Sequence, residues 1–278
     1  MHNNQHRAAV CGKPIGHSLS PVIHNAGFAA AGLTGWNYTA IECAETELAD
    51  LVAGLGPEWA GLSLTMPLKE AGLRLAAEAS PTARAVGAAN TLVRRADGAW
   101  RADNTDVAGM VRVLRGAGLN FRTPVISVLG GGGTARAALA AAAELGAEAV
   151  TLVTRRPEAR DDLAPVADAL GLRLAGLDWA GAAAAFDADA VISTVPKGAA
   201  DHLAGTVAWR PGTVLFDALY DPWPTPLAAG ALANGNPVVS GLDLLLAQAL
   251  SQFEQFTGVR PAPEAAMCAA LSAAAGQR

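Results

Sequence analysis

Apolar residues follow either the spacing of a strand or the spacing of a helix, and short strand-like runs alternate with helix-like stretches almost throughout the chain. The run from Val125 to Leu129 is apolar apart from one serine, which is typical of a strand buried on both faces of a parallel sheet. Strands that alternate with helices in this way predict the α/β class. The other segments that we expect to be strands are residues 7–11, 60–65, 149–153, 190–193, 214–218 and 238–239.

Helical spacing fills most of the stretches between these strands. Ser20 and Pro21 predict an N-cap followed by proline at the first helical position, and Gly32 predicts the end of that helix. Residues 91–95 and 100–103 flank a turn sequence and predict a hairpin. Further helices are expected over residues 48–55, 68–79, 107–115, an alanine-rich stretch ending at 145, 242–256 and 263–274.

The composition bounds the size of the fold and the class of partner. The chain has 278 residues, of which 51% are hydrophobic and 16% charged, with a net charge of -5. This length suits two domains with buried cores. An acidic chain has no broad attraction for nucleic acid or anionic lipid, so we expect neither nucleic acid nor a membrane as a partner.

Cysteine and histidine usage favours a cytoplasmic protein without a metal. Cys11, Cys43 and Cys268 lie far apart and have no CxxC spacing, which fits reduced thiols. The five histidines show no HExxH or other metal-binding spacing. The first residues lack the apolar core of a signal peptide, and the alanine-rich runs are too short to span a bilayer.

A glycine cluster stands between a predicted strand and a predicted helix. Residues 130–135, GGGGTA, have the spacing GxGGxA, a variant of the dinucleotide-binding GxGxxG. Glycines let the backbone turn tightly and approach a ligand closely, and the N–H groups at a helix start favour a pyrophosphate. Alone, the cluster would indicate only a flexible turn. Between a strand and a helix that leads to another strand, it predicts a dinucleotide site.

The residues after the next strand predict which dinucleotide binds. An acidic residue there would bind the 2′-hydroxyl of NAD, whereas this chain has Thr154, Arg155 and Arg156. Two guanidinium groups suit the 2′-phosphate of NADP, and Arg160 is a further candidate. A solvated basic helix start is the competing interpretation, which we would prefer if the glycine cluster did not precede it.

Lysine is scarce in a chain that uses arginine almost everywhere. Lys13, Lys69 and Lys197 are three of the 20 basic residues, and the other seventeen are arginines. A partly buried lysine can release its proton near neutral pH and an arginine cannot, so a retained lysine is a candidate for acid–base chemistry. Lys69 follows Thr65 at a strand end, where α/β proteins place their sites.

Two further polar residues stand at expected turns. Asp106 precedes the helix predicted from residue 107, and its local sequence is equally consistent with an N-cap. Asn90 lies in the segment GAANT and is equally consistent with an ordinary turn residue.

The order of several motifs resembles that of the shikimate dehydrogenase family. Residues 12–21, GKPIGHSLSP, resemble the family's substrate-binding opening, and residues 63–69 resemble its NxTxPxK segment. The matches occur in the family's order and cover nearly the whole chain, so together they are specific although each is weak alone. The other matching segments are GAANTL at 87–92, NTD at 104–106, the glycine cluster, YDPWPTPL at 220–227 and GLDLLLAQ at 241–248.

The resemblance implies an NADP-dependent oxidoreductase that interconverts 3-dehydroshikimate and shikimate, on the pathway to chorismate and the aromatic amino acids. It implies that Lys69 and Asp106 are the catalytic pair. The substrate contacts that it implies are Ser18 and Ser20 for the carboxylate and Thr65, Asn90, Gln248 and Tyr220 for the ring hydroxyls. The NADP contacts that it implies are Gly130, Gly131, Gly132, Gly133, Thr134, Ala135, Thr154, Arg155, Arg156, Thr194, Ala218 and Gly241.

The chemistry of these residues agrees with the implied reaction. Oxidation of a secondary alcohol removes a hydride, which the nicotinamide takes, and a proton, which a lysine amine can take. We expect residues 1–106 plus 242–278 to form an α/β substrate-binding and catalytic domain. Residues 107–241 are expected to form a Rossmann-type NADP-binding domain, with the C-terminal helices returning to the first. The protein is expected to be cytoplasmic, and a monomer or homodimer.

The chain departs from the family pattern at several positions. Ser63 stands where the family has Asn, which should alter a supporting hydrogen bond. Thr154 stands where Asn is usual, and Arg156 stands where Thr is usual. The resemblance therefore assigns the cofactor contacts less firmly than the substrate contacts. Residues 195–198 differ from the family's small polar turn, and residues 241–245 lack its usual methionine.

Three alternatives remain at this point. Quinate differs from shikimate by one ring hydroxyl, and the sequence leaves open a quinate or broad-specificity dehydrogenase. A non-catalytic regulator of the same fold would not need both Lys69 and Asp106. A folate-type or glutamyl-tRNA-reducing Rossmann enzyme would share the second domain without the opening that contains Ser18 and Ser20.

Overall fold

The computed structural model describes residues 5–276. Contacts divide the chain into two compact units, one built from the residues up to Thr105 and from Leu245 onward, the other from Asp106–Leu244. The chain leaves the first unit within α5 (Thr105–Gly116) and returns within α9 (Gly241–Thr257). The boundaries expected from the sequence were 106/107 and 241/242, and the roles assigned to the two units stay predictions.

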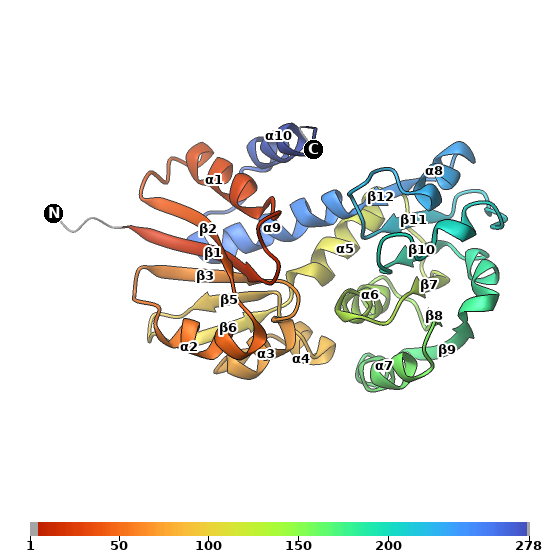
Figure 1. The fold of residues 1–278 in the computed structure, drawn as a ribbon, viewed down its shortest axis with the longest axis horizontal. Coiled ribbons are helices and arrows are strands. Elements are labelled where there is room, and N and C mark those ends of the chain that lie inside the picture. Colours follow the sequence, from red (N-terminus) through yellow and green to blue (C-terminus); the bar gives the residue numbers. More distant parts are fainter. Residues whose placement is uncertain (1–4, 277–278) are drawn as a thin grey trace. The chain divides into compact units, whose positions relative to one another are not determined.

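The first unit contains a mixed sheet. Among the described residues it has six strands in the order β2-β1-β3-β5-β6-β4, in which β2, β1 and β3 are parallel and β5 is antiparallel to both β3 and β6 (Figure 1). The hairpin predicted from residues 91–103 is therefore confirmed as β5 and β6. The strands are β1 (His6–Gly12), β2 (Trp36–Glu42), β3 (Trp59–Leu64), β4 (Glu78–Ala79), β5 (Thr91–Arg94) and β6 (Trp100–Asp103).

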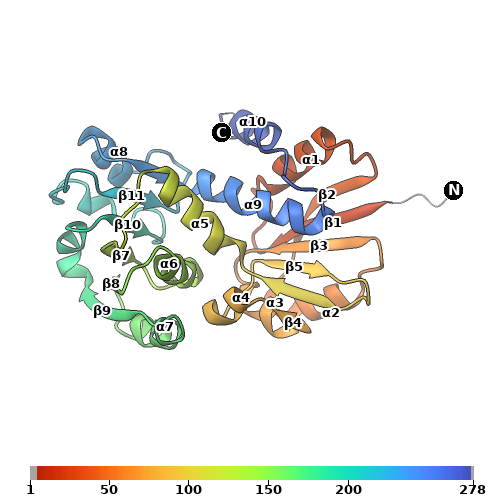
Figure 2. The same ribbon diagram turned by 180° about the vertical axis from the view of Figure 1, so that it is seen from behind.

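Alternate residues of β3 face opposite layers of this unit. Leu62 and Leu64 belong to a buried apolar cluster with residues of the helices that follow β2 and β3. Gly61 and Ser63 face α9, and a Cβ at Gly61 would overlap the ring of Phe256 on that helix. Figure 2 shows α9 along this face of the sheet. The helices of the unit are α1 (Ser20–Ala30), η1 (Glu45–Glu47), α2 (Leu48–Ala53), α3 (Lys69–Leu75), α4 (Pro81–Val86), α9 from Leu245 onward, and α10 (Glu264–Ala275).

Two predictions of local structure in this unit are wrong. Ser20 is the first residue of α1 and not its cap, because the cap position falls on Leu19 and the Ser20 N–H donates to the hydroxyl of Ser18 at 3.3 Å. The helix predicted over residues 68–79 ends at Leu75, because Ala76 is extended and residues 78–79 pair with β6. An open sheet edge has overridden helical spacing in that segment.

The second unit contains a parallel sheet. Its strands in the described part of the chain run in the order β12-β11-β10-β7-β8-β9, which is the 3-2-1-4-5-6 order of a doubly wound dinucleotide fold, so the predicted α/β class is confirmed. The strand order reverses between β7 and β10, whose carboxyl ends define the expected ligand position. The strands are β7 (Ile126–Leu129), β8 (Ala149–Thr154), β9 (Arg173–Asp178), β10 (Ala190–Ser193), β11 (Val214–Asp217) and β12 (Val238–Ser240).

The helices of the second unit cover both faces of its sheet (Figure 1). Strand β9 and helix α7 were not predicted, because β9 is a mostly exposed edge strand without an apolar run and α7 contains Pro165. No helix in residues 5–276 is both long enough and apolar enough to cross a membrane. The helical elements of the unit are most of α5, α6 (Gly133–Glu144), α7 (Glu158–Ala169), η2 (Trp179–Phe186), η3 (Asp201–Leu203), α8 (Pro226–Ala233) and the first turn of α9.

Candidate active site

In the first unit, the loops after β1 and β3 are bonded to each other at the carboxyl ends of these parallel strands. The Lys13 N–H donates to the carbonyl of Met66 at 3.1 Å, and the Thr65 N–H donates to the carbonyl of Cys11 at 3.0 Å. A sheet brings such strand ends together, and sites in α/β proteins form there. The loop that contains Ser18 and the loop that contains Thr65 therefore share one edge of the sheet.

Lys69 and Asn90 lie beside the same edge. Lys69 is the half-buried first residue of α3, and its carbonyl accepts a hydrogen bond of 2.8 Å from the N–H of Ala89. Asn90 is buried, and its carbonyl accepts a hydrogen bond of 2.7 Å from the N–H of Leu64. The structure thus brings the backbones that hold Thr65, Lys69 and Asn90 together.

The Asn90 side chain is bonded to the turn that precedes α5. Its Oδ1 accepts hydrogen bonds from the Thr105 N–H at 2.8 Å and from the Thr91 hydroxyl at 2.8 Å. Asp106 follows Thr105 as the buried second residue of α5. Because Asp106 lies inside the helix, the N-cap interpretation is wrong, and the turn interpretation of Asn90 omits these side-chain bonds.

The helix α9 carries three glutamines at positions i, i+4 and i+7, which is the spacing of one helix face. Gln248, the predicted substrate contact, is buried and donates from Nε2 to the carbonyl of Leu245 at 2.9 Å. Gln252 is the residue of this row that bonds the Asn90 carbonyl, at 3.2 Å. Gln252 was missed from the sequence, although a row of glutamines on an otherwise apolar helix was the available signal.

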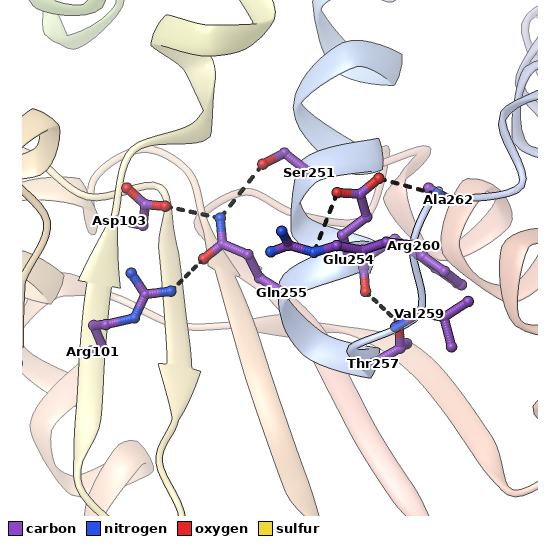
Figure 3. Close-up of polar contacts among 10 residues, drawn as sticks. Arg101, Asp103, Ser251, Glu254, Gln255, Thr257, Val259, Arg260 and Ala262 are labelled. Carbon is purple, nitrogen blue, oxygen red and sulfur yellow. Dashed lines mark hydrogen bonds and ion pairs between the residues drawn. The ribbon is translucent and has the colours of Figure 1, made fainter.

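Gln255, one turn further along α9, bonds two residues of β6 (Figure 3). Its Nε2 donates to Asp103 Oδ2 at 2.8 Å, and its Oε1 accepts from Arg101 at 2.9 Å. The other oxygen of Asp103 accepts from the Ser80 hydroxyl at 2.6 Å and from the Asn104 N–H at 2.8 Å. Asp103 therefore fixes the turn from which Asn104, Thr105 and Asp106 follow.

A nucleophilic cysteine is not part of this site. Cys11 lies buried in β1, next to the loops described above. Burial raises the pKa of its thiol to about 12, and the neighbouring Cys43 adds to this shift. The thiol therefore stays protonated near neutral pH, where a thiolate would be needed for attack.

In the second unit, the glycine cluster turns between β7 and α6 at the point where the strand order reverses. Gly130 has a φ of +106°, a left-handed conformation that favours glycine. A Cβ at Gly130 would also lie 2.6 Å from the hydroxyl oxygen of Thr194, which donates to the carbonyl of Leu129 at 2.8 Å. Gly130 and Thr194 are thus brought together at the ends of β7 and β10.

The next glycines differ in what surrounds them. A Cβ at Gly131 would lie 2.7 Å from the Cβ of Ala159 on α7, so this glycine permits close packing. A Cβ at Gly132 or Gly133 would meet nothing within 4 Å. Gly132 is the N-cap of α6 and has no side chain to accept from the first N–H groups of this helix, which include those of Thr134 and Ala135, and such a helix start suits a pyrophosphate.

The residues after β8 lie where the adenine ribose of a dinucleotide is expected. Thr154 ends β8 and is buried, and Arg155 and Arg156 follow it as exposed residues. Arg160, in the first turn of α7, extends across β9, because a Cβ at Gly176 would overlap its guanidinium group. The exposed arginines provide donors for a phosphate, and an acidic residue that would repel it is absent from residues 154–156.

The loop after β11 is held by a buried carboxylate. Asp217 accepts a hydrogen bond of 2.7 Å from the Thr225 hydroxyl and one of 3.2 Å from the Leu219 N–H. Burial raises the pKa of Asp217, and these hydrogen bonds oppose that shift. A Cβ at Gly241 would overlap the carbonyl of Ala218 and lie 3.0 Å from the ring of Tyr220, so these three predicted residues are close together.

Two family models match parts of the chain. Residues 10–92 match the shikimate dehydrogenase substrate binding domain, and residues 241–271 match the shikimate 5'-dehydrogenase C-terminal domain. A curated relative from Dinoroseobacter shibae, named shikimate dehydrogenase (NADP(+)), is 38% identical over 266 residues. The alignment covers 91% of this chain and 92% of that protein.

Solved structures agree with this likeness over nearly the whole chain. The shikimate dehydrogenase of Mycobacterium tuberculosis is 46% identical with a TM-score of 0.88, and the match covers 96% of this chain and 99% of that one. The shikimate 5-dehydrogenase of Thermus thermophilus, solved with NADP(H) and shikimate, is 28% identical with a TM-score of 0.83. That match covers 97% of this chain and 100% of the other.

Proposed function

Because this chain belongs to the shikimate dehydrogenase family, we propose that it catalyses the reversible NADP-dependent reduction of 3-dehydroshikimate to shikimate. The enzyme is an oxidoreductase that acts on a CH–OH group, in the biosynthesis of chorismate and the aromatic amino acids. The observation that carries this function is the likeness to named shikimate dehydrogenases along 91% of the chain and more.

We propose that Lys69 transfers the proton of the reacting hydroxyl. In the oxidation of shikimate its amine accepts that proton, and in the reduction its ammonium group returns it. Asp106 pairs with Lys69 in this proposal, as an acceptor that orients the amine. The support is that Lys69 begins a helix at the carboxyl end of β3 and that Asp106 is a buried carboxylate in the first turn of α5.

We propose that the substrate is oriented by the polar residues of the first unit and by Tyr220. Ser18 and Ser20 bind its carboxylate, a role supported by their bonded pair at the start of α1. Thr65 and Asn90 bind ring hydroxyls at the edge where their backbones meet. Gln248 and Tyr220 complete this set.

We propose that NADP binds along the carboxyl edge of the parallel sheet of the second unit. When bound, its nicotinamide accepts or returns the hydride. The helix start at Gly132 and Gly133 holds the pyrophosphate, and Arg155 with Arg156 binds the 2′-phosphate. The open space at these two glycines supports this assignment. The other residues assigned to the cofactor are Gly130, Gly131, Thr134, Ala135, Thr154, Thr194, Ala218 and Gly241.

Initial-rate measurements test the proposed function directly. The purified protein is assayed for reduction of NADP and of NAD, each with shikimate and each with quinate. Turnover with NADP and shikimate is expected. Comparable rates with quinate would assign the broader quinate/shikimate specificity, a preference for NAD would contradict the role of the two arginines, and no turnover by folded protein would contradict an enzymatic function.

We propose further that the protein is cytoplasmic and is a monomer or a homodimer. An exposed free thiol at Cys268 supports a reducing compartment. Light scattering on the eluting protein would determine the oligomeric state, and a larger assembly would contradict this part of the proposal.

A further inference from the structure

A continuous chain of hydrogen bonds crosses the interior of the first unit from β2 to the predicted substrate contact Asn90. The Tyr38 hydroxyl donates to the Ser63 hydroxyl at 2.6 Å, and Ser63 donates to Gln252 Oε1 at 2.7 Å. Gln252 Nε2 donates to the Thr91 hydroxyl at 3.0 Å and to the Asn90 carbonyl at 3.2 Å. Thr91 in turn donates to Asn90 Oδ1 at 2.8 Å.

Each member of this chain has one consistent direction of donation. A hydroxyl that accepts from one neighbour donates to the next, so Ser63 and Thr91 each relay the direction set by the group before them. Gln252 is 1% exposed, its oxygen accepts a hydrogen bond from Ser63, and its nitrogen donates to Thr91 and Asn90. A buried amide with both ends engaged cannot turn over without losing these bonds.

The direction of the chain determines the orientation of the Asn90 amide. The Thr91 hydroxyl accepts from Gln252 Nε2 at 3.0 Å and donates to Asn90 Oδ1 at 2.8 Å, which is shorter than its 3.4 Å contact with the Thr105 hydroxyl. The Thr105 N–H donates to the same Asn90 oxygen, so that oxygen is fixed between two donors. A rotated Asn90 amide would direct N–H groups at these donors, which is unfavourable.

We infer that Gln252 is a positioning residue, which sets the orientation in which Asn90 binds a ring hydroxyl of the substrate. This inference rests on the proposed function. It also assigns a role to Ser63, which stands where an asparagine was expected. A serine there is small enough for Gln252 to reach β3 from α9, and its hydroxyl both accepts from Tyr38 and donates to Gln252.

Replacement of Gln252 by methionine, which keeps the length of the side chain and removes its hydrogen bonds, tests the inference. The KM for shikimate is expected to rise by about tenfold, the usual effect of one lost or misdirected hydrogen bond. The KM for NADP is expected to stay unchanged, because Gln252 lies in the other unit.

A double-variant comparison separates positioning from a general loss of stability. If Gln252 acts through Asn90, the pair Gln252→Met with Asn90→Ala should have the same KM for shikimate as Asn90→Ala alone, to within about twofold. Thr257→Val is the matched control, because it removes two hydrogen bonds at the end of α9, one to the Phe253 carbonyl and one from the Val259 N–H, and neither belongs to the chain from Tyr38 to Asn90. This control is expected to lower the melting temperature and to leave the KM for shikimate unchanged.

The outcomes distinguish this inference from the proposed function. If the wild-type protein does not turn over shikimate, the proposed function is wrong and the inference fails with it. If the wild type is active and Gln252→Met has the wild-type KM, or adds its effect to that of Asn90→Ala, only the inference is wrong. If Gln252→Met does not fold, Ser63→Ala is measured instead, with an expected rise of about threefold from a loosened Gln252 amide; an unchanged KM would overturn the inference.

Discussion

The imidazole of His24 stacks face to face on the phenol ring of Tyr38, with ring centroids 4.1 Å apart and planes inclined by 2°. Both rings are buried, between α1 and the sheet of the first unit. Burial lowers the pKa of His24 to about 3. The Gln252 side chain opposes this shift but does not outweigh burial. His24 is therefore neutral in the folded protein at neutral pH.

This neutral histidine predicts a loss of stability in mild acid. Between the unfolded pKa of 6.5 and the folded value of about 3, the unfolded chain binds a proton that the folded chain does not. The free energy of unfolding should therefore fall as the pH drops below 6.5, by about 1.4 kcal/mol for each pH unit once His24 is fully charged in the unfolded chain.

Denaturant unfolding of the wild type and of His24→Phe between pH 4 and pH 8 measures this contribution. Subtracting the two curves of unfolding free energy against pH cancels the contributions of other titrating groups, such as Asp217. A difference that is flat below pH 6.5 would show that the folded protein accommodates a charged His24.

Lys69→Ala is expected to lower turnover by roughly 10²–10⁴-fold, the usual contribution of acid–base assistance, with a modest change in substrate binding. Lys69→Arg should lose a similar factor, because arginine keeps the charge and does not exchange its proton near neutral pH. Arg74→Ala, on the exposed side of the same helix, serves as the control and should be as active as the wild type. Unaltered turnover in either Lys69 variant would remove this residue from proton transfer.

Alanine substitutions should separate two uses of glycine in the cluster after β7. Gly130→Ala places a side chain at a φ of +106° and 2.6 Å from the Thr194 hydroxyl, so we expect a loss of about 1 kcal/mol or more in stability. Gly133→Ala adds its methyl group to open space, so stability should be kept while the KM for NADP rises. Thermal melts and NADP titrations check both outcomes, and equal melting temperatures would contradict the distinction.

Replacement of Arg155 and Arg156 by glutamine should weaken the binding of NADP and leave the binding of NAD unchanged. A hydrogen bond to a charged group contributes about 1.5–3 kcal/mol, so we expect roughly a 10–100-fold rise in the KM for NADP. Arg173→Gln, at an exposed position on β9, is the matched control. Steady-state kinetics with both cofactors measure the ratio, and a parallel loss for NAD would assign these arginines to a part of the cofactor common to both.

Several elements that follow local rules were predicted from the sequence, although α4 and α8 were missed despite the N-caps Ser80 and Thr225 that precede a proline. The apolar run before Gly130 and the hairpin around Gly98 are each specified within a few residues, and both are present in the structure. Lys69 was singled out because lysine is scarce and because it stands at a strand end, whereas the role of Asn90 came only from the family resemblance. Their roles stay predictions until the variants are measured.

Gln252 shows why the remainder was missed. Its partners Ser63 and Asn90 lie more than 160 residues away in the chain, and no local pattern pairs them. The same holds for Glu78, where pairing with β6 replaced the helix that local spacing predicts. Local propensity is weak compared with tertiary contacts, so such positions are decided by the fold as a whole.

The discontinuous first unit has a consequence for how the protein is made. Domains generally fold as units during synthesis, in the order in which they leave the ribosome. Here Asp106–Leu244 is continuous in sequence, whereas the first unit is complete only after the residues from Leu245 onward have been synthesised. Until α9 emerges, Ser63 and Asn90 lack Gln252, and the face around Gly61 lacks Phe256. We therefore expect the second unit to mature first, and the nascent first unit to be the part of the chain that chaperones bind.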